Sequence, residues 1–452
     1  MQRLLLPLLA ALAASAAGQP APRVVVLVTL DTTRADHLGA YGYPRPTTPF
    51  IDALARRGVV FENAFSPISH TAPSHATIFT GLYPAQHGVR SNGEGFPDGD
   101  DTGFSTLAER FEAAGYRSAA FTSVRFLAPI TRGFGYVNVG NGRPHRPAGA
   151  TIEQVVDWLK LRRRDERIFA WIHLFDPHQA DRAPEAQRAA LAFASDAEAQ
   201  RFATEISTRR GVHGGVFDGP LQLAAFYAGY DAQIRYADSE LGRLHAWMQR
   251  HGFGDDAWWI VTADHGEGLG QHGHRNHGRY VYDEQLRVPL IVSGRGVPAG
   301  RRVSGLAHLT DLWPSLADLL GQESRQPTHE LRGLSLLPSL TGTALPARQV
   351  YAERRPRDER RLKWERADLF ATFDLDWKYI AKSEDADEFY DRRSDPLELQ
   401  NRIAEHSPVR ERLAAAARAA WAQLKAEGAR YKPRPADPKA LEELRALGYV
   451  NQ

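Results

Sequence analysis

The sequence predicts an α/β fold in which a mostly parallel central sheet lies between helical layers, followed by a small C-terminal α+β subdomain. The first observation is that short β-rich apolar runs alternate with helical segments along most of the chain. Such alternation is typical of parallel strands joined by crossover helices. The second is that 452 residues, 43% of them hydrophobic, can supply one large core and a smaller companion.

The predicted elements follow one another as strand, helix and strand. Residues 24–30 form a continuous apolar, β-branched run, the pattern of a central strand covered on both faces. A helix at 106–115 ends at Gly115, which suits a helix C-terminus. The further expected elements are helices at 50–57, 151–160 and 231–249 and strands at 117–122, 168–173 and 257–262.

The composition changes beyond Gly342, where the second part of the predicted fold begins. A charged stretch at 348–366 is followed by expected hairpin strands at 369–373 and 377–381 and by a helix at 408–428. We therefore place the main α/β domain at 22–342 and the α+β subdomain at 343–452. Residues 182–222, rich in Ala, Arg and Gln, are interpreted as an insertion near the opening of the site.

The N-terminal residues have the features of an export signal. Arg3 precedes a short apolar run from Leu4 to Ala14, and small residues follow up to Gly18. This arrangement predicts a signal peptide at 1–18, because a membrane anchor needs a longer apolar stretch. No later segment is long and apolar enough to span a bilayer, so we expect a periplasmic or secreted protein without a stable membrane anchor.

The overall charge gives no reason to expect a nucleic-acid partner. The 56 basic and 54 acidic residues leave a formal net charge of +2, so any anion must be bound locally. The chain has no cysteine, which excludes disulfides and thiolate metal ligands.

Acidic and imidazole side chains follow three of the predicted strands. Asp31 follows the first strand, Asp176 and His178 follow the strand at 168–173, and Asp264 with His265 follows the strand at 257–262. Ligands of open parallel sheets gather beyond the carboxyl ends of the strands. Carboxylate and imidazole groups meeting there indicate a divalent-metal site suited to zinc, manganese or calcium.

Five segments of the chain resemble, in the same order, motifs of the sulfatase family within the alkaline phosphatase superfamily. These segments are Leu30-Asp-Thr-Thr-Arg-Ala-Asp-His-Leu-Gly-Ala-Tyr-Gly42, Thr71-Ala-Pro-Ser-His-Ala-Thr-Ile-Phe-Thr-Gly81, Asp264-His-Gly-Glu-Gly-Leu-Gly-Gln-His-Gly273, Phe389-Tyr-Asp391 with Asp395-Pro-Leu-Glu-Leu-Gln-Asn401, and Leu444-Arg-Ala-Leu-Gly-Tyr-Val450. The resemblance runs over nearly the whole chain after the predicted signal. It implies an alkaline-phosphatase-like fold and an ester hydrolase.

The chain departs from this family at the nucleophile. The resembling enzymes have Cys or Ser where this chain has Thr71, and oxidise it to formylglycine. Threonine cannot become an aldehyde because its β-carbon bears a methyl group, but its hydroxyl can attack an ester directly. Thr71 therefore favours phosphomonoesters, phosphodiesters or phosphonates over sulfate esters.

The resemblance also implies a metal site formed by Asp31, Thr71, Asp264 and His265. Thr32 stands where many sulfatases have a second Asp, so one carboxylate is missing. This favours zinc or manganese over calcium. The side chains available for a second metal are Asp176, His178 and His277, but Asp176-Pro-His178 matches the sulfatase pattern better than that of the bimetallic enzymes.

Four residues are candidates for contact with the substrate or the nucleophile. Asn92 matches an amide that contacts a non-bridging oxygen in related enzymes, although Ser-Asn-Gly is also ordinary turn chemistry. His277 stands where the family has a Lys on the leaving-group oxygen, so it is a candidate general acid or substrate ligand. His178 is a further candidate for contact with the substrate. His75 replaces a family Arg and either hydrogen-bonds near Thr71 or packs under the following helix.

The sequence as a whole predicts an exported, metal-dependent hydrolase that attacks a phosphate or sulfate ester through Thr71. The expected substrate is a small-molecule, glycan-linked or lipid-linked ester. One alternative is a phosphoryl or phosphoethanolamine transferase, against which the absence of predicted membrane spans counts. The other is an inactive binding protein with the same fold; the intact set of Asp31, Asp264, His265 and Asn92 argues against it.

Overall fold

The computed structural model describes residues 21–97, 103–140, 145–179, 182–213, 215–354, 368–428, 433–435, 438–447 and 449. The predicted signal peptide at 1–18 lies outside the described residues. Among the helices that are described, none is long and apolar enough to cross a bilayer.

The described residues form a central sheet of nine strands, with β9 paired to β2 and the other strands in the order β4-β3-β5-β1-β6-β8-β2-β7. The strands from β4 to β6 in this order are parallel, β8 is antiparallel to both β6 and β2, and β9 is parallel to β2. This confirms the predicted mostly parallel sheet. The strands are β1 (Val24–Leu30), β2 (Gly58–Phe65), β3 (Arg117–Thr122), β4 (Tyr136–Val139), β5 (Ile168–Leu174), β6 (Ala257–Thr262), β7 (Arg287–Val288), β8 (Leu290–Ser293) and β9 (Arg301–His308).

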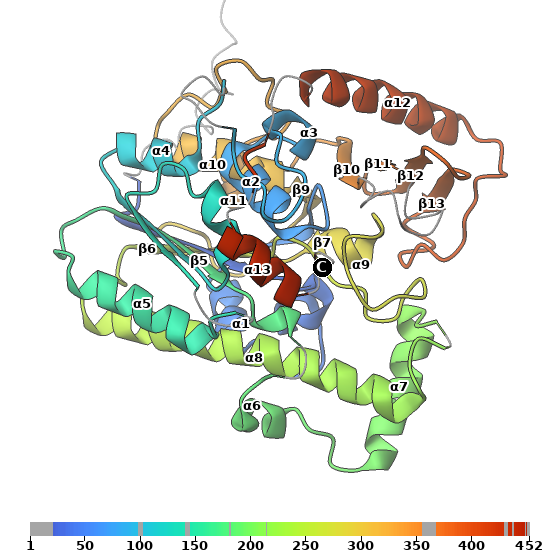
Figure 1. Ribbon diagram of the computed structural model, residues 1–452, viewed down its shortest axis with the longest axis horizontal. Helices are drawn as coiled ribbons and strands as arrows, with labels where there is room; N and C mark the ends of the chain where they lie inside the picture. Colours follow the sequence, from blue (N-terminus) through green and yellow to red (C-terminus); the bar gives the residue numbers. More distant parts are fainter. Residues whose placement is uncertain are drawn as a thin grey trace, which may run out of the picture.

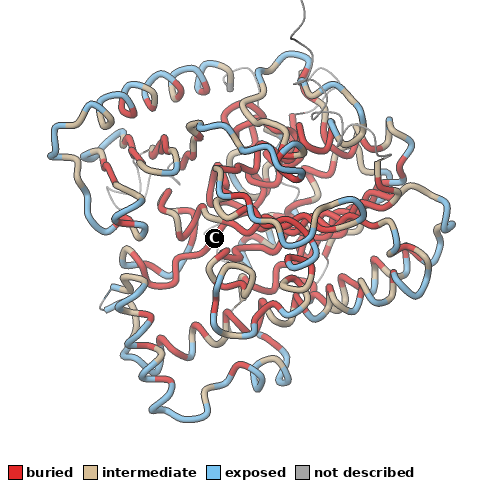
Figure 2. The backbone as a smooth tube through the Cα atoms, turned by 180° about the vertical axis from the view of Figure 1, so that it is seen from behind, coloured by how far each residue is buried: buried red, intermediate tan, exposed pale blue. Residues whose placement is uncertain are grey.

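The central strand β1 is buried on both faces because its side chains alternate between two cores. Val25 and Leu27 belong to the core on one face of the sheet, and Val24 and Val26 to the core on the other. Figure 2 shows the strands in the middle of the molecule as buried. The continuous apolar run read from the sequence is therefore explained by helices on both faces.

Helical layers cover the two faces (Figure 1). One layer contains α2 (Thr71–Thr80), α4 (Leu107–Ala113), α10 (Leu312–Leu319) and α11 (Leu337–Thr341), and the other contains α1 (Pro49–Arg56), α5 (Ala148–Lys160) and α8 (Pro220–Arg250). Short helices in the connections are α3 (Pro84–His87) and α9 (Asp283–Leu286).

The helix expected at 231–249 is wrong at its start, since α8 already begins at Pro220. Gly219 has a φ of 92°, and Pro220 stands in the first turn, where its missing N–H costs nothing. The predicted insertion at 182–222 thus ends inside α8 and contains α6 (Glu185–Ala190) and α7 (Asp196–Arg210). The insertion contacts the loop between β6 and α9 (residues 263–282), which contains the predicted ligands Asp264 and His265 and is called the metal loop below: the backbone N–H of His213 donates to the Gly270 carbonyl oxygen (2.9 Å).

A second, antiparallel sheet confirms the predicted small C-terminal α+β unit. Its strands are β10 (Val350–Arg354), β11 (Leu369–Phe373), β12 (Trp377–Lys382) and β13 (Glu388–Asp391), and α12 (Pro408–Gly428) covers it. One face packs under α12 through Phe370 and Tyr379, while Ala371 and Ile380 on the other face pack against the main domain. The boundary at residue 342 remains a prediction.

The chain returns to the main domain after the second sheet. In Figure 1, α13 (Pro438–Ala446) lies over the middle of the molecule, well apart from α12. Ala440 and Leu444 are buried in the core of the central sheet. The Glu443 carboxylate accepts hydrogen bonds from the backbone of Arg125 (2.7 Å) and Phe126 (2.9 Å), at the start of the 3-10 helix η3 (Arg125–Ile130).

Candidate active site

The carboxyl ends of β1 and β6 place the predicted ligands side by side. The two strands are neighbours in the sheet, Asp31 follows β1 directly, and Asp264 follows β6. Thr71 is the first residue of α2, whose N-terminal end favours negative charge. Asp31, Thr71, Asp264 and His265 are all fully buried.

Asp31, Asp264 and His265 offer ligand atoms that all lie within 4.8 Å of one another. Asp264 accepts hydrogen bonds through Oδ1 from the backbone of Thr32 (3.1 Å) and His265 (2.9 Å), which leaves Oδ2 without a partner. His265 Nδ1 lies 2.8 Å from the Gly266 carbonyl oxygen, so its proton is on Nδ1 and Nε2 presents a lone pair.

Four buried polar atoms at this point have no hydrogen-bond partner: Asp31 Oδ1, Thr71 Oγ1, Asp264 Oδ2 and His265 Nε2. Buried polar atoms are almost always satisfied, and each exception costs free energy. Carboxylate, hydroxyl and imidazole donors form a set that a divalent cation would satisfy. The residues present therefore fit the metal site that the sequence predicted.

The electrostatics of Asp31 agree with a missing positive charge. Burial raises the pKa of Asp31 well above its usual range, and the nearby carboxylates of Asp264 and Glu267 raise it further. Asp31 Oδ2 lies 3.1 Å from His173 Nε2. His173 thus orients this carboxylate.

Asn92 lies next to the predicted nucleophile. Its Oδ1 accepts a hydrogen bond from the backbone of Ala72 (2.9 Å), the residue after Thr71. Its Nδ2 is buried and has no partner. The contact holds the Asn92 amide beside the first residues of α2 with its N–H donors unused, which favours the substrate contact over a role in the turn alone.

His75 belongs to α2, and its imidazole does not hydrogen-bond to the Thr71 hydroxyl. Its Nδ1 lies 2.8 Å from the Thr71 carbonyl oxygen, and its Nε2 lies 2.9 Å from the Thr29 hydroxyl, which also accepts a hydrogen bond from Trp171. Burial lowers the pKa of His75. Both predicted alternatives are thus partly met: His75 hydrogen-bonds near Thr71, but through the backbone and as part of the packing beneath α2.

His277 and His178 meet at the hydroxyl of Tyr449. This hydroxyl lies 2.6 Å from His178 Nε2 and 3.1 Å from His277 Nε2. His277 Nδ1 contacts the Glu267 carboxylate at 3.1 Å, and its ring lies 4.5 Å from that of His265. Burial raises the pKa of Glu267 to about 8, although His265 opposes this.

Sequence reasoning missed Tyr449 as a residue of the site and gave no role to Glu267. Both stand inside motifs that were recognised, the segment that starts at Asp264 and the tail that ends at Val450. What the sequence does not carry is the return of the tail to the central sheet.

The structure does not bring together the three residues proposed for a second metal. Asp176 accepts a hydrogen bond from the backbone of Ala148 (3.1 Å) at the start of α5. His178 and His277 instead share Tyr449. In the part of the chain that the structure describes, the only group of at least three metal-ligating side chains is that of Asp31, Asp264 and His265.

His272 connects the metal loop to the C-terminal signature segment. Its Nδ1 lies 2.9 Å from Glu284 and its Nε2 lies 3.0 Å from the Glu398 carbonyl oxygen. His272 and Glu398 have positive φ angles of 49° and 56°, which non-glycine residues rarely adopt. Although burial lowers the pKa of His272, Glu284 raises it to about 9, so the residue supports the junction and not the metal.

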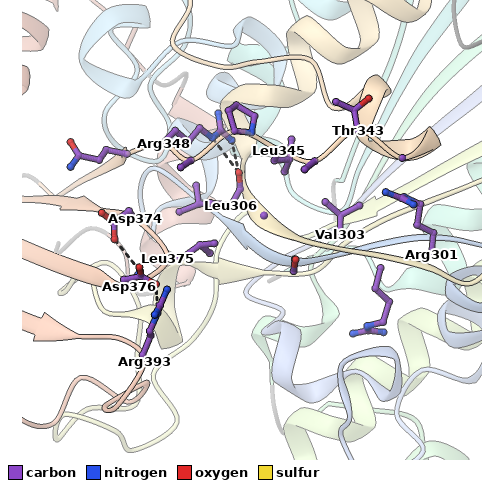
Figure 3. A pocket seen from close by; sticks show the side chains of 18 of the residues that line it. Arg301, Val303, Leu306, Thr343, Leu345, Arg348, Asp374, Leu375, Asp376 and Arg393 are labelled. Carbon is purple, nitrogen blue, oxygen red and sulfur yellow. Dashed lines mark hydrogen bonds and ion pairs between the residues drawn. The ribbon is translucent and has the colours of Figure 1, made fainter. Parts of the chain in front are cut away.

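A cavity of about 930 Å³ lies elsewhere, between β9 and the second sheet (Figure 3). Its lining includes Arg301, Leu306, Arg348 and Asp376, and none of the predicted site residues. Arg348 is engaged with Asp311 and Arg393 with Asp376. The candidate active site is therefore identified by the grouped metal-ligating side chains around Thr71, and not by this cavity.

Comparison with known proteins identifies the family of this chain. The family model for sulfatases matches residues 23–322, so the chain belongs to the sulfatase family. It is 26% identical over 478 residues to the multifunctional alkaline phosphatase superfamily protein PehA of Trinickia caryophylli, covering 83% of this chain and 90% of that protein. A choline-sulfatase of Rhizobium meliloti (strain 1021) is 30% identical over 174 residues, which is 38% of this chain and 32% of the relative.

The phosphonate monoester hydrolase of Agrobacterium radiobacter has a similar solved structure. Its TM-score is 0.70 and its sequence identity 25%, and the match covers 90% of this chain and 96% of that one. Sulfatase and phosphonate monoester hydrolase relatives indicate an enzyme that hydrolyses sulfate or phosphate esters.

Proposed function

We propose that this protein is an exported, metal-dependent hydrolase that cleaves a phosphate or phosphonate ester by direct attack of Thr71. The observation that carries the proposal is the Thr71 hydroxyl, which is buried without a hydrogen-bond partner at the N-terminal end of α2, beside three metal-ligating side chains. A hydroxyl in such a place can serve as an activated nucleophile.

Asp31, Thr71, Asp264 and His265 would hold the cation. When bound, a divalent cation there would favour the alkoxide of Thr71 and offset negative charge on the substrate. Thr71 Oγ1 forms a bond to phosphorus while the bond to the leaving oxygen breaks, and that oxygen takes up a proton. Water then hydrolyses the threonine ester and regenerates the hydroxyl.

Asn92 and His277 act on the substrate oxygens in this scheme. The free amide nitrogen of Asn92 donates to a non-bridging oxygen, on which negative charge builds up in the transition state. His277, in the position of the leaving-group Lys of the family, faces the departing oxygen. His75 and His173 orient Thr71 and Asp31 without touching the substrate.

Two arguments favour phosphorus over sulfur. Threonine lacks the second hydroxyl with which hydrated formylglycine expels sulfate, so a sulfated threonine would have to be hydrolysed by water. The similarity to a phosphonate monoester hydrolase points the same way. The imidazole of His265 and the absence of a second acid at Thr32 favour zinc or manganese over calcium.

We expect the organic part of the substrate in a cavity of about 240 Å³. One of its lining residues is Arg279, which follows His277 by two positions in the sequence. Tyr280, Tyr282, Lys382 and Glu388 line it, so it combines aromatic surface with charge of both signs. Such a lining suits a small polar group or a sugar that carries the ester.

Turnover of matched esters tests the nucleophile and the element attacked. We expect p-nitrophenyl phosphate, bis-p-nitrophenyl phosphate or a phenylphosphonate monoester to be hydrolysed faster than p-nitrophenyl sulfate. Thr71→Ala should lower kcat by about 10³-fold or more, whereas Thr71→Ser, which keeps the hydroxyl, should retain measurable activity. Full activity in Thr71→Ala, or sulfate as the best substrate, would overturn the proposal.

Metal content tests the cofactor independently of turnover. Protein purified without added metal should contain about one equivalent of zinc or manganese by elemental analysis. Asp264→Asn should lose it, and Asp176→Asn should retain it as the matched control. Stoichiometric calcium alone would contradict the metal assignment, and equal loss in both variants would contradict the ligand set.

Export is tested by N-terminal sequencing of the protein from the periplasm or the medium, where a mature chain should begin near residue 19.

A further inference from the structure

The Tyr449 hydroxyl is the centre of a chain of hydrogen bonds that begins at Gln179. Gln179 Nε2 lies 3.3 Å from His178 Nδ1, His178 Nε2 lies 2.6 Å from Tyr449 Oη, and Tyr449 Oη lies 3.1 Å from His277 Nε2. His277 Nδ1 then contacts the Glu267 carboxylate at 3.1 Å and 3.2 Å. Every polar atom of both imidazoles is thus engaged.

A single hydroxyl proton links the two rings. Tyr449 can donate to one imidazole only, so at least one of the two rings must donate to it from Nε2. When the Tyr449 proton goes to the other ring, His178 and His277 hold complementary states at Nε2: one ring carries a proton and the other a lone pair.

The hydroxyl is held in place by the packing of the C-terminal segment. Leu444 is fully buried, and its carbonyl oxygen accepts a hydrogen bond from the backbone of Tyr449 (2.8 Å). Glu443 is bonded to η3, as described above, and the Tyr449 ring lies 6.0 Å from that of Phe126. His178 is fixed from its other side, because its ring stacks on Phe175 at 4.3 Å.

We propose that Tyr449 is a positioning residue of the active site, whose hydroxyl fixes the tautomers and ring orientations of His178 and His277 towards the leaving-group oxygen. This inference rests on the proposed function, which gives His277 that oxygen. A ring that rotates or changes tautomer presents the wrong atom to the departing group. The effect should therefore grow with the basicity of the leaving group, since only a poor leaving group needs such assistance.

Tyr449→Phe removes both hydrogen bonds and keeps the ring packed against Phe126. For an alkyl phosphate or phosphonate ester we expect kcat to fall about 10- to 100-fold with KM changed less than about twofold. For the p-nitrophenyl ester, whose leaving group needs little help, kcat should change less than about threefold. Tyr116→Phe is the matched control, because its hydroxyl also donates a short hydrogen bond, to Pro22 (2.6 Å), but away from the site.

An equal loss of kcat for good and poor leaving groups, or no loss for either, would overturn the proposal. The hydrogen bonds are tested without turnover by NMR of protein labelled with ¹⁵N in the histidine rings. The wild type should show opposite Nε2 protonation in His178 and His277, assigned with His178→Gln and His277→Gln, and Tyr449→Phe should abolish this pairing. Identical spectra in the wild type and Tyr449→Phe would exclude the link even if the protein hydrolysed none of the esters, an outcome that would separately refute the proposed function.

Discussion

At the scale of single residues, the proposed function gives Asn92 two separable tasks. Its Oδ1 accepts from the backbone of Ala72, and its Nδ2 is the free donor. Asn92→Asp keeps the acceptor and removes the donor, so kcat should fall about 10²-fold with little change in the free energy of unfolding. Steady-state kinetics with a melting curve checks this. Asn92→Ala, which also leaves the Ala72 N–H unpaired, should be destabilised as well, and unchanged kcat in Asn92→Asp would place Asn92 in the turn only.

We expect Thr32 to set the charge of the predicted metal site, because it is neutral where many sulfatases have Asp. Its backbone donates to Asp264, its hydroxyl is buried without a partner, and its φ of 53° is one that Asp tolerates better than most residues. Thr32→Asp adds a carboxylate among oxygen ligands, so calcium should gain affinity by about 10-fold relative to zinc or manganese. Competition between the metals in equilibrium dialysis measures this ratio. Thr32→Val is the control for the hydroxyl alone, and an unchanged ratio in Thr32→Asp would show that position 32 does not face the cation.

At the scale of elements, the junction between the metal loop and the C-terminal segment depends on the charge of His272. The folded pKa of about 9 lies above the ordinary value of 6.5, so the stabilisation is complete below pH 6.5 and is lost as the pH rises through 9. His272→Asn, which suits the positive φ, should cost roughly 3 kcal/mol at pH 6 and progressively less up to pH 10. Urea unfolding across this range measures the difference.

The partner of His272 supplies the control for that pH dependence. In a Glu284→Gln background the same His272→Asn change should lose most of its dependence on pH, because the carboxylate that raises the pKa is gone. A constant difference between pH 6 and pH 10 in the original background would mean that His272 is neutral in the folded protein.

The elements also show where sequence patterns succeed. The bounds of β1 and β6 agree with prediction because a buried parallel strand is a nearly continuous apolar run. The bounds of β3 agree because it directly follows a helix terminated by Gly115, and those of α12 because Pro408 and Gly428 mark its ends. The start of α8 was missed because residues 220–230 extend a helix whose buried face is set by α7, a tertiary contact.

The residues of the candidate site likewise fall into those that the sequence predicts and those that only the fold reveals. Asp31, Asp264 and His265 were predictable because each follows a strand and carries a ligand group. Tyr449 was not, because its role depends on α13 packing against η3, more than 300 residues earlier in the chain. The different partners of Asp176 and His178 were likewise invisible, since only the fold reveals that Asp176 bonds to the start of α5 while His178 contacts Tyr449.

At the scale of the whole molecule, the two sheets are joined through a buried group of charges. Lys378 of β12 lies 2.8 Å from Asp283 of α9 and 2.7 Å from Glu398, and its side chain is fully buried. Lys378→Met should lower the free energy of unfolding by about 3–5 kcal/mol, because it leaves two carboxylates against one remaining partner, Arg392. Denaturant unfolding tests this.

A surface pair of the same C-terminal unit gives the matched comparison. Lys425 lies 3.0 Å from Asp368 and is about half exposed, so Lys425→Met should cost no more than about 1 kcal/mol. A loss in Lys378→Met as small as that in Lys425→Met would mean that the second sheet is held by its apolar face alone.

The order of β1, β5 and β6 bears on how the chain folds. Val24 of β1 pairs with Ile168 on one side and with Ala257 on the other. The central strand therefore pairs only with strands that lie far later in the sequence. Contacts of such long sequence separation slow folding, because the entropy of closing the loop is lost before the strand pairing contributes stabilising contacts. Asp31 and Asp264 follow two of these strands, so we expect the predicted metal site to form only when the two strands pair. A cation that binds only the folded site should then stabilise the paired strands.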